Sequence, residues 1–362
     1  MALDQITLSD FRNHADTRLV GTRGFNLLIG ENGAGKTNIL EALSLFAPGR
    51  GLRRASLAEM IGGGGPGGMA IGASLHTANQ DEPVRLGSHI DPARPGRRLV
   101  RINGSESSAV TLGEWLSISW LTPAMDRLFA DSAGARRRFL DRMVLALDPL
   151  HARHAARYEA ALRERNRLIS DDREPEAAWL DGVEQQLAEH GAMLASGRAM
   201  LISRLMEEMA ILPEAPFARP ALSYAAGGPI LRSDLASALL ENRRRDRRAG
   251  RTLAGPHRDD LGVQMAGKGV PAASCSTGEQ KAMLIAIILA HASLAAKGRP
   301  NLLLLDEVAA HLDPLRREAL FARLRSSGAQ VWLTGTELAQ FGAIRGEAAI
   351  WRVEEGAAER VE

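Results

Sequence analysis

The sequence has one cysteine and no long hydrophobic run. Cys275 is the only cysteine among 362 residues, so no disulfide forms within the chain, which excludes small secreted scaffolds built on disulfides. The longest apolar stretch, residues 282–296, is too short to span a membrane. The N-terminus alternates polar and apolar residues and does not follow the layout of a signal peptide. We therefore expect a soluble, cytoplasmic protein that makes no membrane contact.

Lysine and aromatic residues are also scarce. Four of the 45 basic residues are lysine and the other 41 are arginine, while aromatic residues make up 4% of the chain. The formal net charge is only +2, so the overall charge does not predict a partner. Arginine clusters are more informative, because a guanidinium binds phosphate through two parallel hydrogen bonds.

The hydrophobic pattern changes along the chain. Residues 69–121 alternate between polar and apolar, with Asn103-Gly104 as a hairpin turn, and predict an antiparallel lobe whose last strand is 116–121. Helical periodicity follows, and then an α/β pattern returns. We predict an α/β head that is interrupted by a helical domain. The expected segments are residues 1–133 (N-terminal part of the head), 134–250 (helical insert) and 251–362 (C-terminal part of the head).

Residues 30–37, GENGAGKT, fit the P-loop pattern G-x-x-x-x-G-K-[ST] and stand between a predicted strand and a predicted helix. In such a loop the backbone N–H groups converge on phosphate, Lys36 reaches the β- and γ-phosphate oxygens, and the Thr37 hydroxyl ligates Mg²⁺. ATP and Mg²⁺ are therefore the predicted cofactors. The predicted nucleotide-binding residues are Gly30, Glu31, Asn32, Gly33, Ala34, Gly35, Lys36, Thr37 and Asn38.

Residues 301–307, NLLLLDE, predict a strand that is buried on both faces and ends in two carboxylates. Open α/β sheets bind ligands at this end of their strands. We predict that Asp306 holds Mg²⁺, directly or through water, and that Glu307 polarises the attacking water. With Lys36, these are the predicted catalytic residues. The alternative is a strand that simply ends in two solvated acids.

Residues 276–279, Ser-Thr-Gly-Glu, form a capping box that opens a buried helix. Their place before the Asp306-Glu307 strand also resembles the signature motif of ATP-binding-cassette (ABC) ATPases. In that motif, a serine and a glycine contact a γ-phosphate bound by a partner subunit. The resemblance implies that Ser276 and Gly278 contact nucleotide across a homodimer. We therefore expect Ser276 to cap its own helix only partially in the single chain.

Two further signals follow the Asp306-Glu307 pair. Asp313 stands where ABC ATPases carry their D-loop, which implies a contact across the dimer, although aspartate before proline is also an ordinary helix start. Residues 331–337 lie where the switch histidine of these ATPases often occurs, but contain no histidine. Thr334 and Thr336 are the alternatives for that place, and the departure suggests slow turnover.

Lys36 and Ser276 are 240 residues apart, whereas transporter ATPases hold these motifs within a short span. The separation resembles that in the heads of the structural-maintenance-of-chromosomes (SMC) and Rad50 class, and the compact helical insert narrows the resemblance to the RecF family of bacterial recombination mediators. The resemblance is carried by LSDFRNH at residues 8–14, the extended P-loop through Arg53, residues 120–143 and GPHRDDL at 255–261. STGEQK departs from the usual S-Q-G-Q-Q-R signature.

The resemblance implies a slow ATPase that dimerises on ATP, binds gapped or junction DNA and, with the partner RecR, helps to load RecA. It also implies that Arg12 and Arg53 reach the nucleotide or DNA.

A zinc site at His257 is not expected, because a single histidine beside acidic residues lacks the geometry of such a site. The alternatives are an ATP-switched scaffold that binds only proteins and the ATPase subunit of a transporter. The candidate DNA contacts, which a solvated surface would explain equally well, are Arg136, Arg137, Arg243, Arg244 and Arg245.

Overall fold

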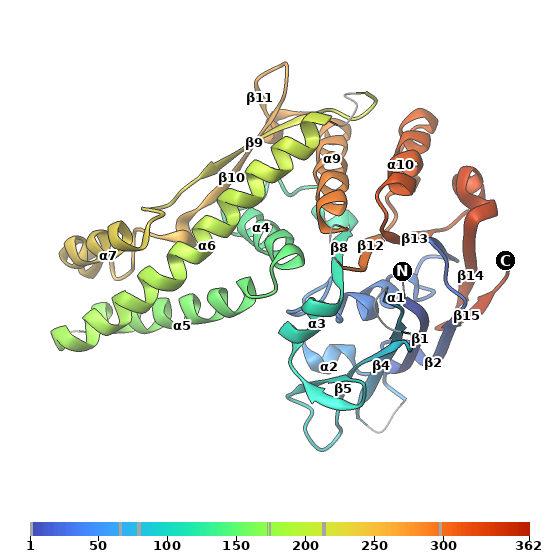
Figure 1. The fold of residues 1–362 in the computed structure, drawn as a ribbon, viewed down its shortest axis with the longest axis horizontal. Coiled ribbons are helices and arrows are strands. Elements are labelled where there is room, and N and C mark those ends of the chain that lie inside the picture. The colour runs from blue at the N-terminus through green and yellow to red at the C-terminus, as the bar shows by residue number, and fades with distance from the viewer. Residues whose placement is uncertain are drawn as a thin grey trace. The chain divides into compact units, whose positions relative to one another are not determined.

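The computed structural model describes residues 3–64, 67–77, 81–171, 173, 175–211, 215–296 and 299–362 (Figure 1). The chain divides into two compact units. Unit 1 contains Met1–Asp126, Leu212–Phe217 and Leu284–Glu362, and unit 2 contains Arg127–Ile211 and Ala218–Met283. Both units are therefore built from segments that are far apart in the sequence.

A six-stranded sheet forms the centre of unit 1, and its strands β14, β3, β13, β12 and β8 are parallel. Every residue of β12 and β13 is buried, as expected for strands covered on both faces. The rings of Trp332 and Trp351 stack with centroids 5.5 Å apart. In sheet order the strands are β15 (Ala357–Arg360), β14 (Ala348–Glu354), β3 (Phe25–Ile29), β13 (Gln330–Gly335), β12 (Asn301–Leu305) and β8 (Ser117–Leu121).

The position of β8 corrects the sequence prediction, which placed residues 116–121 in the antiparallel lobe. β8 pairs in parallel with β12, and Leu121 lies opposite Leu305. Its alternating serines suggested a solvent-facing side, but all five residues are buried. The Ser119 hydroxyl is satisfied inside the protein by the ring of His291, with Oγ 3.0 Å from Nδ1. A strand whose alternate polar side chains have buried hydrogen-bond partners therefore shows the same polar–apolar alternation as a half-exposed strand.

The predicted antiparallel lobe is present as a second sheet of unit 1. One face of this sheet packs on α1 (Lys36–Ser44) through a shared apolar cluster. Asn103 and Gly104 have φ values of 50° and 85° and form the predicted hairpin turn. In sheet order the strands are β2 (His14–Val20), β1 (Leu3–Phe11), β4 (Met69–Leu75), β5 (Val84–Ile90), β6 (Arg98–Ile102) and β7 (Ser105–Ser107), and the short helices are α2 (Leu57–Met60) and α3 (Ala109–Trp115).

Unit 2 is mainly helical, and the helix predicted near 176–211 is α6 (Ala177–Ile211), which lies beside α5 (His151–Ser170) in Figure 1. It also contains a small antiparallel sheet that the sequence did not predict. β9 (Pro220–Ala225) pairs with β10 (Asp260–Met265), which is distant in sequence, so no local pattern indicated the pairing. The remaining elements are α4 (Ala133–Leu147), α7 (Arg232–Glu241), α8 (Arg243–Ala249) and β11 (Val270–Pro271).

Two further helices, α9 (Thr277–Ala295) and α10 (Pro314–Ser326), stand next to β12 in the sequence. α9 precedes β12, and α10 connects β12 to β13. α9 contains most of the longest apolar stretch of the sequence, residues 282–296, which was predicted as a buried helix. Within the described part of the chain, none of the helices combines the length and the apolar character that a bilayer crossing requires.

Candidate nucleotide site and its surroundings

The P-loop runs from the end of β3 to the start of α1. Gly33 and Gly35 have φ values of 87° and 118°, in a region that other residues avoid. A Cβ atom on Gly35 would lie 2.8 Å from the side chains of both Asn13 and His14. Glycine is therefore required at residue 35 by backbone conformation and by close packing.

Lys36 is 4% exposed, and its ammonium group lies inside the loop. The Nζ atom donates hydrogen bonds to the carbonyl oxygens of Gly30 and Glu31, both at 2.7 Å. Burial lowers the pKa of Lys36, and the charges of Glu307 and Asp306 act in the opposite direction. The predicted lysine and the two predicted carboxylates are thus brought together from opposite ends of the chain.

Thr37 and Asp306 offer a pair of oxygen ligands that fits Mg²⁺. The Thr37 hydroxyl donates to Asp306 Oδ1 at 2.9 Å, so the two predicted ligands lie side by side. No cluster of three or more histidine, cysteine or acidic side chains suited to a metal occurs in the described ranges. Mg²⁺ needs no such cluster, because it is usually bound by one or two protein oxygens together with phosphate and water.

Glu307 follows Asp306 at the carboxyl end of β12 and is half-buried. Its backbone adopts φ 53°, a left-handed conformation that is uncommon outside glycine. The Glu307 N–H donates to the Thr334 hydroxyl at 2.9 Å, and the Thr334 hydroxyl donates to Asp306 Oδ1 at 2.8 Å. The sequence left Thr334 and Thr336 as alternatives, and Thr334 is the one that contacts the acidic pair.

The turn between β1 and β2 supports the P-loop. Asn13 Nδ2 donates to the Ala34 carbonyl at 3.0 Å, and His14 Nε2 lies 3.0 Å from the Gly35 carbonyl. Asn38 Nδ2 in turn donates to Asn13 Oδ1 at 2.6 Å. The sequence pointed to FRNH only through a family resemblance, because these contacts join two loops 21 residues apart and no local pattern encodes them.

Arg12 and Arg53 converge on Glu41, a fully buried carboxylate of α1. Arg12 donates through Nε and Nη2 to both carboxylate oxygens, at 3.0 and 2.9 Å, and Arg53 Nη1 lies 3.0 Å from Oε2. The family resemblance implied contacts with nucleotide or DNA. Their contacts with Glu41 give both arginines a structural role beside the P-loop helix.

The signature residues begin α9 in unit 2. Glu279 N–H donates to the Ser276 hydroxyl at 3.3 Å, and Ser276 N–H donates to Glu279 Oε2 at 2.9 Å. The Ser276 hydroxyl also donates to Glu279 Oε2 at 3.0 Å. The capping box is therefore complete, and the expectation of a partial cap in the single chain is wrong. The Glu279 carboxylate thus accepts hydrogen bonds from both donors of Ser276, its backbone N–H and its hydroxyl.

Gly278 and Asp313 occupy helix starts. Apart from the neighbouring residues and the backbone of α9, none of the described residues has an atom within 4 Å of the place where a Cβ on Gly278 would stand. Asp313 caps α10, because its Oδ1 accepts the Arg316 N–H at 2.9 Å. The structural role of Asp313 is thus the ordinary helix start that the sequence offered as an alternative.

Three of the five candidate DNA contacts have partners within unit 2. Arg136 makes two bonds of 2.7 Å to the carboxylate of Asp260. Arg137 donates to the Asp259 carbonyl at 2.7 Å, and Arg243 pairs with Asp181 and Glu184. Arg244 and Arg245 are exposed and take part in no ion pair among the residues that the structure describes. Among the five candidates, Arg244 and Arg245 are thus the exposed arginines that pair with no acidic side chain of the described residues.

GPHRDDL forms the centre of a buried polar network. Arg198 makes two bonds of 2.8 Å to Asp141 and one of 2.8 Å to Asp259. His257 Nδ1 lies 2.8 Å from the Tyr158 hydroxyl, and its Nε2 lies 2.9 Å from the Thr252 carbonyl. A neutral ring satisfies both contacts, with Nε2 as the donor and Nδ1 as the acceptor. The motif therefore organises unit 2.

Acidification is expected to destabilise unit 2 through His257. Burial is the main cause that lowers the pKa of His257, and the charges of Arg258 and Arg137 add to it. In the unfolded chain the ring of His257 has a pKa of about 6.5, so it binds a proton more readily than in the folded protein. The contribution of the neutral ring to the free energy of unfolding is therefore fully present above about pH 6.5, and it is lost as the pH falls through the lower folded pKa. In urea unfolding between pH 7.5 and 5, His257→Gln should flatten the dependence of the unfolding free energy on pH by at most about 1.4 kcal/mol per pH unit.

The exposed His76 provides the control for this measurement, because about half of its side chain is open to solvent. His76→Gln removes a histidine from unit 1, so it shows what the loss of an exposed ring alone does to the measured slope. An equal slope in the His257→Gln and unchanged proteins would show that His257 does not titrate differently on unfolding.

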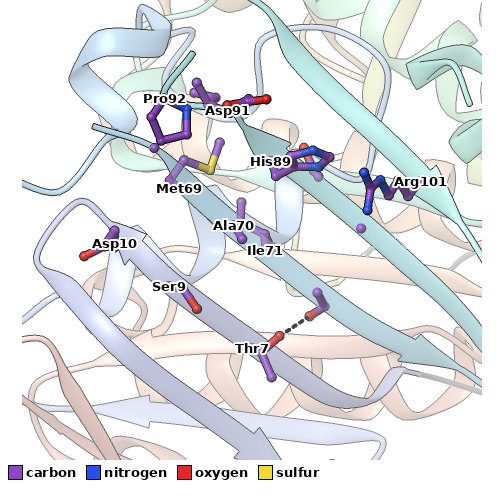
Figure 2. A pocket seen from close by; sticks show the side chains of 15 residues that line it. Thr7, Ser9, Asp10, Met69, Ala70, Ile71, His89, Asp91, Pro92 and Arg101 are labelled. Atoms are coloured by element: carbon purple, nitrogen blue, oxygen red, sulfur yellow. Dashed lines mark hydrogen bonds between the residues drawn. The ribbon is translucent and has the colours of Figure 1, made fainter. Parts of the chain in front are cut away.

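A shallow cavity of about 530 Å³ lies on the outer face of the antiparallel sheet (Figure 2). Small residues, including Ala70, Gly72 and Gly87, leave this hollow between larger neighbours. The Thr7 hydroxyl marks one end, where it donates to the Gly72 carbonyl at 3.5 Å. None of the lining residues belongs to the P-loop or to β12, so this cavity is separate from the candidate nucleotide site.

Comparison with known proteins agrees with this arrangement. The family model described as RecF/RecN/SMC N terminal domain matches residues 2–356. Relatives from Mesorhizobium japonicum and Brucella suis, both named DNA replication and repair protein RecF, are 44% identical to the chain. The alignments cover 98% of this chain and 96% and 95% of the two relatives.

Solved structures show the same fold. A structure described as the recombination mediator protein RecF-ATPrS in the RecFOR pathway has a TM-score of 0.87 at 21% identity, over 99% of this chain and 98% of that one. The Smc head domain of Pyrococcus furiosus has a TM-score of 0.55 at 16% identity, over 99% of this chain and 96% of that one. The predicted fold, an ABC-type ATPase head with an antiparallel lobe and an inserted helical domain, is confirmed. With a family match along nearly its whole length and relatives at 44% identity, the chain belongs to the RecF/RecN/SMC family and, within it, to the RecF proteins of DNA replication and repair.

Proposed function

We propose that the protein is a slow, Mg²⁺-dependent ATPase that dimerises on ATP and binds gapped or junction DNA in recombinational repair and replication restart. The observation that carries the proposal is the meeting of Lys36, Thr37, Asp306 and Glu307, linked by hydrogen bonds and charge across 269 residues of sequence. In this proposal residues 30–38 bind the nucleotide, Thr37 and Asp306 hold Mg²⁺, and Glu307 polarises the attacking water.

ATP is proposed to stabilise a dimer in which Ser276, Gly278 and Asp313 contact the nucleotide of the partner copy. A γ-phosphate shared by two chains is a ligand that only the assembled state can bind fully, so ATP shifts the equilibrium towards the dimer. Hydrolysis removes the shared phosphate and releases the dimer. The hydrogen bonds from Ser276 to Glu279 would have to open before the serine could donate to phosphate.

The proposed partners are DNA and a RecR-type protein, with RecA loading as the outcome. The names of the relatives support a role in DNA replication and repair. Binding through arginine to phosphate would be largely independent of base sequence, because phosphate contacts position a protein without reading bases.

Replacing Arg244 and Arg245 by alanine is expected to weaken binding to gapped duplex equally for different sequences. If both arginines contact phosphates, the slope of log K against log salt should become less steep by about 2, since each phosphate contact contributes about 0.9 to it. Fluorescence anisotropy with ATP, over a series of salt concentrations, measures this slope.

The matched control removes the same charge from the exposed loop of the antiparallel lobe, as Arg94→Ala with Arg97→Ala. An unchanged slope in the Arg244/Arg245 variant would exclude these residues as DNA contacts. If the unchanged protein shows no salt-dependent binding to DNA, the result favours an ATP-switched scaffold that binds only proteins.

A further inference from the structure

Thr334 lies between the two strands that carry the candidate nucleotide site. It is the fifth residue of β13, which pairs in parallel with β3 on one side and β12 on the other. Thr334 is opposite Leu28 in β3, and its predecessor Leu333 is opposite Leu305 in β12. Its side chain is therefore at the carboxyl ends of the strands, and the residue is only 1% exposed.

The Thr334 hydroxyl is committed on both sides. It accepts the backbone N–H of Glu307 at 2.9 Å and donates its single hydrogen to Asp306 Oδ1 at 2.8 Å. The same Asp306 oxygen accepts the Thr37 hydroxyl at 2.9 Å. A continuous chain of hydrogen bonds thus joins Thr37, Asp306, Thr334 and Glu307. A side chain without a hydroxyl at residue 334 would break this chain at two points.

The backbone of Glu307 needs such support. Its φ of 53° is left-handed, and a non-glycine residue in this region carries about 1–3 kcal/mol of strain that persists only where the surroundings impose it. The bond to Thr334 engages the N–H of this same residue. Since the backbone conformation sets the direction of the side chain, the bond from Thr334 to this backbone helps to determine where the Glu307 carboxylate points.

Thr336, the other hydroxyl after this strand, has no comparable contact. It is exposed, and its side chain forms no hydrogen bond in the part of the chain that the structure describes. Gly335 lies between the two threonines under the ring of Phe341, where a Cβ atom would come within 2.5 Å of the ring. This packing holds the end of β13 in place and keeps Thr334 directed at the acidic pair.

We infer that Thr334 is a positioning residue for ATP hydrolysis, whose hydroxyl orients Asp306 and holds the backbone of Glu307 in the conformation that aims its carboxylate. The inference rests on the proposed ATPase function and deepens it. Among the described residues, the Thr334 side chain forms no hydrogen bond with Lys36 or with the backbone of the P-loop, and Lys36 donates instead to the carbonyl oxygens of Gly30 and Glu31. Its hydroxyl is linked to the P-loop residue Thr37 only through Asp306 Oδ1, so its loss is expected to affect hydrolysis more than nucleotide binding.

Thr334→Val tests the inference, because valine keeps the shape of threonine and removes the hydroxyl. Single-turnover ATP hydrolysis should slow by about 10- to 100-fold, the usual effect of losing a side chain that orients a catalytic metal ligand. The dissociation constant for a fluorescent ATP analogue should stay within about threefold, since binding and chemistry depend on different groups. Thr334→Ser should restore the rate to within a few fold of the unchanged protein.

Thr336→Val is the matched control and should hydrolyse ATP at the unchanged rate. Thermal melts of all variants identify a loss of folding, in which case Thr334→Ala, which introduces no extra methyl beside Asp306, replaces the valine variant. Hydrolysis by Thr334→Val at the unchanged rate, or equally slow hydrolysis by Thr334→Ser, overturns the inference. The unchanged protein is measured first: if it does not hydrolyse ATP, the proposed function fails, whereas a failure confined to the variants sinks only the role of Thr334.

Discussion

Lys36→Met is expected to abolish ATP-driven dimers. The ammonium group is the only positive side chain of the P-loop, and without it the β- and γ-phosphates lose their charged ligand. Because the dimer is proposed to form around the γ-phosphate, the loss of affinity for ATP also removes the gain in dimer stability. Light scattering of the variant with and without ATP should give the mass of one chain in both conditions. Retention on gapped DNA should be lost in parallel.

Glu307→Gln is the companion variant and should have the opposite effect. Glutamine keeps the size of the side chain and removes the charge that polarises water, so ATP binds and the dimer forms but does not hydrolyse its ligand. Long-lived dimers are the expected result. ATP-stabilised dimers of Lys36→Met, provided its thermal melt shows a folded protein, would contradict the proposal that ATP at this loop drives assembly.

Arg165→Leu is expected to destabilise unit 2 by about 3–5 kcal/mol, because it leaves a buried carboxylate without its partner. Arg165 and Asp246 are both fully buried, and Arg165 Nη1 lies 2.7 Å from Asp246 Oδ2. The same guanidinium also bonds Glu184, Thr252 and the Leu239 carbonyl. Glu184 retains Arg243, so Asp246 carries most of the loss. Urea unfolding followed by circular dichroism measures the change.

Arg163→Leu is a matched control on the same helix. Its side chain is 73% exposed, and its one ion pair among the described residues is with the exposed Glu159, at 3.9 Å. Removal of such a surface pair changes stability by less than about 1 kcal/mol. Equal stability of the two leucine variants would show that the buried network does not hold unit 2 together.

The parts of the candidate nucleotide site that consist of residues adjacent in the sequence could be predicted from the sequence. The P-loop and the Asp306-Glu307 pair are short local patterns, and the runs around them predict the strand before each. The turn at Asn103-Gly104 and the helix near 176–211 were predicted for the same reason. Asn13 and His14, which hold the P-loop, were not assigned this role, because their partners are carbonyl groups that carry no sequence signal.

The amino-acid sequence by itself determined the local elements, the phosphate-binding loop and the family, because periodicity, turn residues and motif spacing act over a few residues. Only the tertiary structure decided which groups meet. It joined β8 to the parallel sheet, paired Arg136 with Asp260 across 124 residues, and selected Thr334 over Thr336. Such choices depend on which side chains the folded chain brings within about 3 Å of one another, and a linear pattern does not encode that distance.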